Sequence, residues 1–134
     1  MEAGHRLTET QRQNVVALIE ALESGKYRQT KGSLRSAEGH CPIGVMCELS
    51  GLGTWEPWQD TDKFLFAIEY DGIIWRRLNF APITVMYHYG MHQDFSEQIV
   101  SLNDRGGVSF ADIARKLRIW LGKGAPQDMS IRGL

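Results

Sequence analysis

Four basic side chains and no acidic one lie in the ten residues from Lys26 to Arg35, with a turn-forming glycine, Gly32, among them. Cations beside amide and aromatic side chains are the groups that proteins use to recognise phosphate and carboxylate groups. We therefore expect an irregular hairpin or loop that binds an anion, although such charges also occur on loops that are merely solvated. The predicted ligand-contact set is Lys26, Tyr27, Gln29, Lys31 and Arg35.

A second candidate for chemistry is the pair His40 and Cys41, which precedes a segment expected to begin a helix. A helix N-terminus and an imidazolium both lower the pKa of a thiol, so a small cysteine-dependent enzyme is an alternative function. No Asp, Asn or further His is placed by the sequence to orient the imidazole. We therefore expect Cys41 and Cys47 to be reduced, with Cys47 in the core.

His88 and His92 are four residues apart, and Asp94 follows. On one continuous helix this spacing would place the side chains on one face and would favour a metal site or a histidine-dependent enzyme. Gly90 lies between the two histidines and is expected to end that helix. No catalytic residue, metal or cofactor is therefore predicted.

The segment 110–117 resembles the first helix of a helix-turn-helix, and its surroundings are basic. The chain after Leu121 is rich in glycine and proline and cannot supply the recognition helix that enters the major groove. Binding of nucleic acid by a DNA-binding regulator is therefore the weaker alternative.

Local signals mark the helices that must position these residues. Thr8 and Gln11 form a capping box, Pro42 and Gly51 bracket a second helix, and Ser109 caps the last. A third helix is expected over 83–89. A fourth, with an apolar stripe, is expected before a sharp polar turn at 103–107.

Asp71 and Gly72 predict a β-hairpin of 64–70 with 73–80, because both positions of a type I′ turn need positive φ. The segment 51–63 before it is expected to be a loop. The alternation predicts one core face of the hairpin. That face consists of Phe64, Phe66, Ile68, Tyr70, Ile73 and Trp75.

The 134 residues contain 43% hydrophobic and 23% charged residues and have a formal charge of −1, which are typical values for one globular domain. The expected fold class is α+β: a single small domain of about five helices packed with a β-hairpin or small antiparallel sheet. Residues 1–122 should form the domain and 123–134 a flexible tail. No secretory signal or membrane span is apparent, so a cytoplasmic location is expected.

Three blocks of sequence carry a resemblance: S-G-K-Y-x-Q-x-x-G-x-L-R over 24–35, C-x-x-G-V-x-C-x-L over 41–49, and L-N-D-x-x-x-x-S-F-x-x-I-A over 102–114. Together they are similar to a family of small proteins encoded by tailed phages and by prophage-like genes. Pro42 stands where the family often has a second cysteine. The resemblance carries over no activity. It implies a viral accessory protein acting in the cytosol of the bacterial host.

The sequence thus favours a phage-type binding protein over an enzyme, and the resemblance implies a role in counter-defence. Its expected partner is a phosphate-bearing nucleotide signal or a host bacterial protein, met through the basic loop. No membrane partner is expected. A homo-oligomer is an open alternative, since the exposed second face of a hairpin needs cover.

Overall fold

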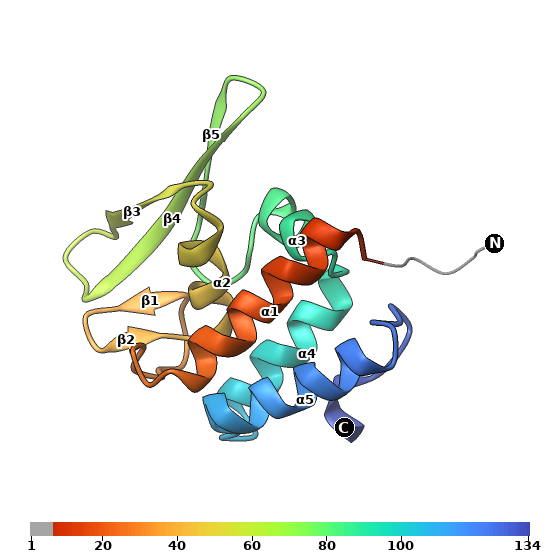
Figure 1. The fold of residues 1–134 in the computed structure, drawn as a ribbon. Helices are drawn as coiled ribbons and strands as arrows, with labels where there is room; N and C mark the ends of the chain where they lie inside the picture. The colour runs from red at the N-terminus through yellow and green to blue at the C-terminus, as the bar shows by residue number, and fades with distance from the viewer. Residues whose placement is uncertain (1–6) are drawn as a thin grey trace.

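The computed structural model describes residues 7–134, so the first six residues of the predicted domain lie outside the described residues. The fold class is as predicted: a single small α+β domain with five α-helices and a five-stranded antiparallel sheet. Figure 1 shows the helices gathered on one side and the strands on the other. The helices are α1 Glu9–Glu23, α2 Pro42–Ser50, α3 Ile83–Tyr89, α4 Gln93–Asp104 and α5 Phe110–Gly122. The strands are β1 Arg35–Ser36, β2 Gly39–His40, β3 Thr54–Pro57, β4 Lys63–Tyr70 and β5 Ile73–Arg77.

The helix ends follow their local signals. Thr8 and Gln11 form a reciprocal capping box at the start of α1. In α2 the Gly44 N–H donates to Cys41 Sγ at 3.4 Å, and Gly51 ends the helix in the left-handed conformation. Ser109 caps α5 by accepting from the Asp112 N–H. These predictions are confirmed.

The sheet has the order β2-β1-β4-β3, with β5 paired to the remaining length of β4. Its third strand corrects the prediction of a loop over 51–63, because β3 pairs with β4 from Thr54 opposite Ala67 to Pro57 opposite Phe64. Gly53 and Pro57 are typical of loops. A proline is nevertheless tolerated at the end of an edge strand, where its missing N–H breaks no ladder.

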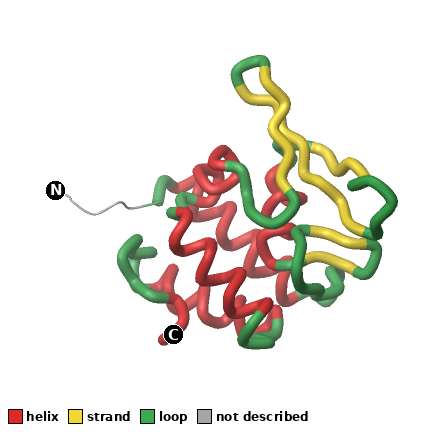
Figure 2. Tube along the Cα trace, turned by 180° about the vertical axis from the view of Figure 1, so that it is seen from behind, coloured by secondary structure: helices red, strands yellow, loops and turns green. Residues whose placement is uncertain are grey.

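The hairpin of β4 and β5 has the predicted register, with Tyr70 opposite Ile73 and with both Asp71 and Gly72 at positive φ. Its predicted core face is only half buried. Phe66 and Ile68 are in the core, whereas Tyr70, Ile73 and Trp75 are exposed. In Figures 1 and 2 the far end of the hairpin projects away from the rest of the molecule, so no helix covers it.

The core lies among the helices and against the near part of the sheet. Val15 and Leu18 of α1 are fully buried, and the rings of Phe95 and Trp120 stack with centroids 4.4 Å apart. The predicted polar turn at 103–107 begins later than expected. α4 continues to Asp104, and Asn103 is completely buried within it.

The residues after Gly122 fold back along α4 and α5. Ala125 and Ile131 are buried, and residues Ile131–Gly133 form a 3-10 helix, η1. The boundary between a domain of 1–122 and a flexible tail of 123–134 stays a prediction, with two of the tail's apolar side chains inside the core. No helix in the part of the chain that the structure describes is long and apolar enough to cross a lipid bilayer.

Candidate functional site

The segment 26–41 folds back on itself and makes an open depression on the surface. The His40 N–H donates to the Arg28 carbonyl and the Thr30 N–H donates to the His40 carbonyl, both at 2.8 Å. Strands β1 and β2 place Arg35 opposite His40. Gly39 permits this close approach, because a Cβ there would overlap the Arg28 carbonyl oxygen.

We call this depression the hollow. Its lining includes residues of the short strands β1 and β2, which Figure 1 labels. Its walls carry three permanent cations, two carboxylates, one imidazole and one phenol. The residues that line it are Lys26, Tyr27, Arg28, Arg35, Ser36, Ala37, Glu38, Gly39, His40 and Glu48.

Two aromatic rings hold the guanidinium group of Arg35. Its Cζ lies 4.7 Å from the ring centroid of Phe64 and 5.5 Å from that of Trp55. Such stacking restricts the long side chain while leaving the N–H edge of the guanidinium available for an oxyanion. Arg35 is therefore the best-positioned cation of the hollow.

His40 is held in place from three sides. Its Nε2 lies 2.7 Å from Oε1 of Glu48, and its ring meets Tyr27 and Trp55 edge-on, with centroids 5.2 and 6.0 Å away. The sequence analysis looked for an Asp, Asn or second His to orient this imidazole, and the structure supplies a Glu instead. Glu48 was missed because it is eight residues away and reaches His40 from within α2.

Tyr27 forms part of the hollow's wall and is half-buried. Partial burial, and then the nearby carboxylate of Glu48, raise the pKa of its phenol. The hydroxyl therefore stays protonated at neutral pH and is available as a hydrogen-bond donor.

The structure brings together only part of the predicted contact set. Lys26, Tyr27 and Arg35 line the hollow, whereas Gln29 and Lys31 do not. Lys31 is exposed, and its ammonium group lies near Gly107 at the turn between α4 and α5. Ligand contact by any of these residues stays a prediction.

Gln29 is directed into the molecule and joins three chain segments. Its Nε2 donates to Asn103 Oδ1 at 2.6 Å and to the Val108 carbonyl at 2.7 Å, while its Oε1 accepts from the Phe110 N–H at 3.0 Å. Asn103 Nδ2 in turn donates to the Thr30 carbonyl at 2.8 Å. We call this pair of amides the Gln29–Asn103 clasp. Its hydrogen bonds fully employ the Gln29 amide and give it a structural role.

The two cysteines are free, as predicted, and both are buried. Burial raises the pKa of the Cys41 thiol to about 11 and that of Cys47 well above its usual value. A nucleophilic cysteine needs a depressed pKa and access to substrate. Cys41 has neither, and its sulfur instead caps α2.

The other histidine pair forms no ligand set. His88 lies in the last turn of α3, and burial lowers its pKa, whereas His92 is the N-cap residue of α4. Within residues 7–134, no three His, Cys, Asp or Glu side chains converge as metal ligands would.

The basic side chains of α5 contact other parts of the same chain. Arg115 donates to the Leu134 carbonyl, Lys116 donates to the Arg132 carbonyl, and Arg118 forms a bidentate pair with Glu23. This face is therefore partly covered, which is unfavourable for duplex DNA.

The fold and the hollow can be compared with known proteins. No curated protein and no solved structure matches the chain. Residues 12–119, by contrast, match the model of a domain of unknown function, DUF8296. The match includes every residue that lines the hollow and both residues of the Gln29–Asn103 clasp. Because it spans most of the sequence, the chain belongs to the DUF8296 family.

Proposed function

We propose that this chain is a non-enzymatic binding protein whose hollow holds a phosphate-bearing ligand. The observation that carries the proposal is the fixed guanidinium of Arg35, stacked on Trp55 and Phe64 at the wall of the hollow. An arginine held by aromatic rings loses little conformational entropy when it meets a phosphate group.

The surrounding charges favour an anion of more than one phosphate group. Lys26 and Arg28 add two exposed cations on the same wall. Of the two carboxylates, Glu48 lies against His40 at 2.7 Å, so Glu38 is the main repulsive group. An acidic side chain of a host protein would meet the same cations and is the alternative occupant.

The proposal extends to the setting in which the protein acts. The sequence resemblance to phage and prophage proteins supports an accessory role in the cytosol of a bacterial host. Sequestration of a nucleotide signal used in defence would be one such role, and it needs binding without turnover. The buried thiol of Cys41, with its raised pKa, supports binding over cysteine catalysis.

The test measures binding by titration calorimetry at low salt, with pyrophosphate, ADP and a cyclic dinucleotide as probes. Arg35→Ala should weaken the affinity about tenfold or more, since a charge-assisted hydrogen bond contributes about 1.5–3 kcal/mol. The matched control is Arg105→Ala, which removes the same charge from an exposed position outside the hollow.

Equal weakening by both variants would show non-specific attraction and contradict the site. Absence of binding by all three probes at low salt would contradict the phosphate proposal. Native mass spectrometry of the protein purified from bacterial cells then distinguishes the alternatives, since a co-purified host protein would identify the other occupant.

A further inference from the structure

The far end of the β4–β5 hairpin exposes large hydrophobic side chains on both of its faces. We call residues 69–75 the arm. Figures 1 and 2 show it extending beyond the helices. A two-stranded hairpin in water is marginally stable unless something covers it. The side chains exposed on the arm are Tyr70, Ile73, Ile74 and Trp75.

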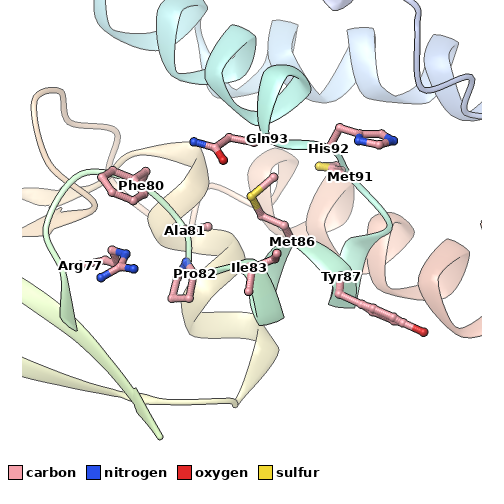
Figure 3. Close-up of a pocket in the computed structure, with 10 residues that line it drawn as sticks. All are labelled: Arg77, Phe80, Ala81, Pro82, Ile83, Met86, Tyr87, Met91, His92 and Gln93. Atoms are coloured by element: carbon pink, nitrogen blue, oxygen red, sulfur yellow. The ribbon is translucent and has the colours of Figure 1, made fainter. Parts of the chain in front are cut away.

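A groove of about 470 Å³ lies at the base of the arm, between the end of β5 and α3 (Figure 3). Its walls are mainly apolar. Ile83 is 80% exposed, and Phe80 and Tyr87 beside it are also exposed. Residues that line the groove include Arg77, Phe80, Pro82, Ile83, Met86 and Tyr87.

Of the nine large hydrophobic residues that are exposed in the described part of the chain, seven lie in the arm and the groove. The largest apolar patch on a typical monomer is about 300–600 Å², and a stable interface buries about 800 Å² on each partner. All seven are at least two-fifths exposed, so they are the main apolar surface available for an interface. They are Tyr70, Ile73, Ile74, Trp75, Phe80, Ile83 and Tyr87.

The outer edge of β5 is open, because within residues 7–134 this strand pairs only with β4. Hydrogen-bonded pairs alternate along an antiparallel ladder, starting from the pair Tyr70 and Ile73 beside the two-residue turn. The main-chain groups of Ile74 and Arg76 therefore point to the open edge. The Arg76 carbonyl there accepts from Nη1 of Arg77 at 3.1 Å, an exposed contact that an added strand would replace. A strand can add there without disturbing β4.

A second copy of β5 fits this edge in an antiparallel register centred on Trp75. That register pairs all five residues of the strand. It places Arg76 opposite Ile74 of the second copy and Arg77 opposite Ile73, so no arginine faces an arginine. A register centred on Arg77 would set two arginines against each other.

The antiparallel arrangement also brings the tip of each arm to the base of the other. Tyr70 and Ile73 then approach the apolar groove of the second copy. Glu69 and Asp71 make the tip acidic. At the base, Arg76 is paired with Glu56 at 2.8 Å, so Arg77, stacked on Trp75 and Phe80, supplies the positive charge. The arm and the groove are therefore both apolar, and the charges beside them are of opposite sign, which suits pairing about a two-fold axis.

We infer that this protein forms a two-fold dimer in which the β5 strands pair edge to edge and each arm packs into the groove of the other copy. The result is one sheet that continues through both copies. This interface lies apart from the hollow, so a failed dimer test leaves phosphate binding unaffected.

Analytical ultracentrifugation of the full chain at about 10 μM tests the inference, since an interface of standard size is commonly populated at that concentration. The expected mass is twice 15.2 kDa. Trp75→Lys should yield a monomer. Leu52→Lys is the matched control, because both side chains are 42% exposed and Leu52 lies outside the arm and the groove.

Ile83→Glu is a second variant. It alters the groove without touching the hairpin, and its side chain is too exposed to affect folding. It should also yield a monomer that remains folded, with a thermal midpoint lower only by the stabilisation that the dimer supplies. Three results would overturn the inference: a monomeric wild type at about 100 μM, a dimer that both variants leave intact, or an open-ended series of larger species.

Discussion

The segment 26–41 has two sides that differ in their surroundings and, by our proposal, in their roles. On the outer side Lys26, Arg28 and His40 line the hollow, where solvent reaches the charges. On the inner side Gln29 and Cys41 face the interior, where every polar atom needs a partner. One short segment therefore supplies both a charged surface and part of the core. We expect substitutions on the outer side to affect ligand binding, as we propose it, and substitutions on the inner side to affect stability.

The largest effect is expected on the inner side. Gln29→Ala leaves Asn103 Oδ1, the Val108 carbonyl and the Phe110 N–H without their partner. Because each unsatisfied buried polar group costs about 1–3 kcal/mol, the free energy of unfolding should fall by about 2–4 kcal/mol. Urea denaturation measures it.

The matched control for the clasp is Gln13→Ala, an exposed glutamine of α1, which should change the free energy of unfolding by less than about 0.5 kcal/mol. Equal losses in the free energy of unfolding for Gln29→Ala and Gln13→Ala would contradict the structural role of the clasp. The variant Gln29→Glu should be nearly as unstable as Gln29→Ala, although its side chain has almost the shape of glutamine. A carboxylate cannot donate a hydrogen bond to the Val108 carbonyl.

An intermediate effect is expected from pH at Cys41, also on the inner side. The folded state raises the pKa of this thiol from 9.0 to about 11, so the unfolded chain releases its proton first. The stability is fully present below about pH 9 and is lost as pH rises toward 11. The loss is about 2–3 kcal/mol for a shift of this size.

Urea midpoints measured from pH 8 to 11 test this dependence. Cys41→Ser keeps an atom that can cap α2 but does not titrate in this range, so its decline should be shallower than that of the wild type. Parallel declines for the two proteins would assign the alkaline sensitivity to other groups.

The smallest effect on stability is expected on the outer side. Lys26→Ala removes an exposed charge that contributes less than about 0.5 kcal/mol to folding. If the hollow binds phosphate groups, the same variant weakens that binding and reduces its dependence on salt. Lys123→Ala, at an exposed position after α5, should change neither property. A large loss of stability in Lys26→Ala would make this residue structural.

The sequence predicted those parts of the fold that short-range chemistry determines. The capping residues Thr8 and Ser109 and the turn at Asp71 and Gly72 act on neighbours within a few positions, so their effects are readable locally. The alternation along β4 likewise predicted the two faces of the hairpin. It did not show how far the helices extend over one face. The exposure of Tyr70 and Trp75, which lie beyond the helices, was therefore not predicted.

The parts that the sequence did not predict depend on distant partners. Gln29 resembles an exposed loop residue until Asn103, 74 positions later, is placed beside it. Glu48 reaches His40 only because α2 packs against β2 and brings its later turns beside the imidazole. Three of the five expected contact residues, Lys26, Tyr27 and Arg35, nevertheless line the hollow, because β1 and β2 place Arg35 opposite His40 and so bring both ends of the segment together.

The close approach of Gly44 to Leu34 limits how the sequence of this fold can diverge in evolution. A Cβ at this position would overlap the Leu34 carbonyl oxygen, so α2 keeps a glycine that lowers its helical stability by about 1 kcal/mol relative to alanine. Single substitutions cannot relieve this conflict, because the helix and the strand-forming segment would have to move apart together. We expect sequence drift around the hollow to leave Gly44 fixed while exposed neighbours vary freely.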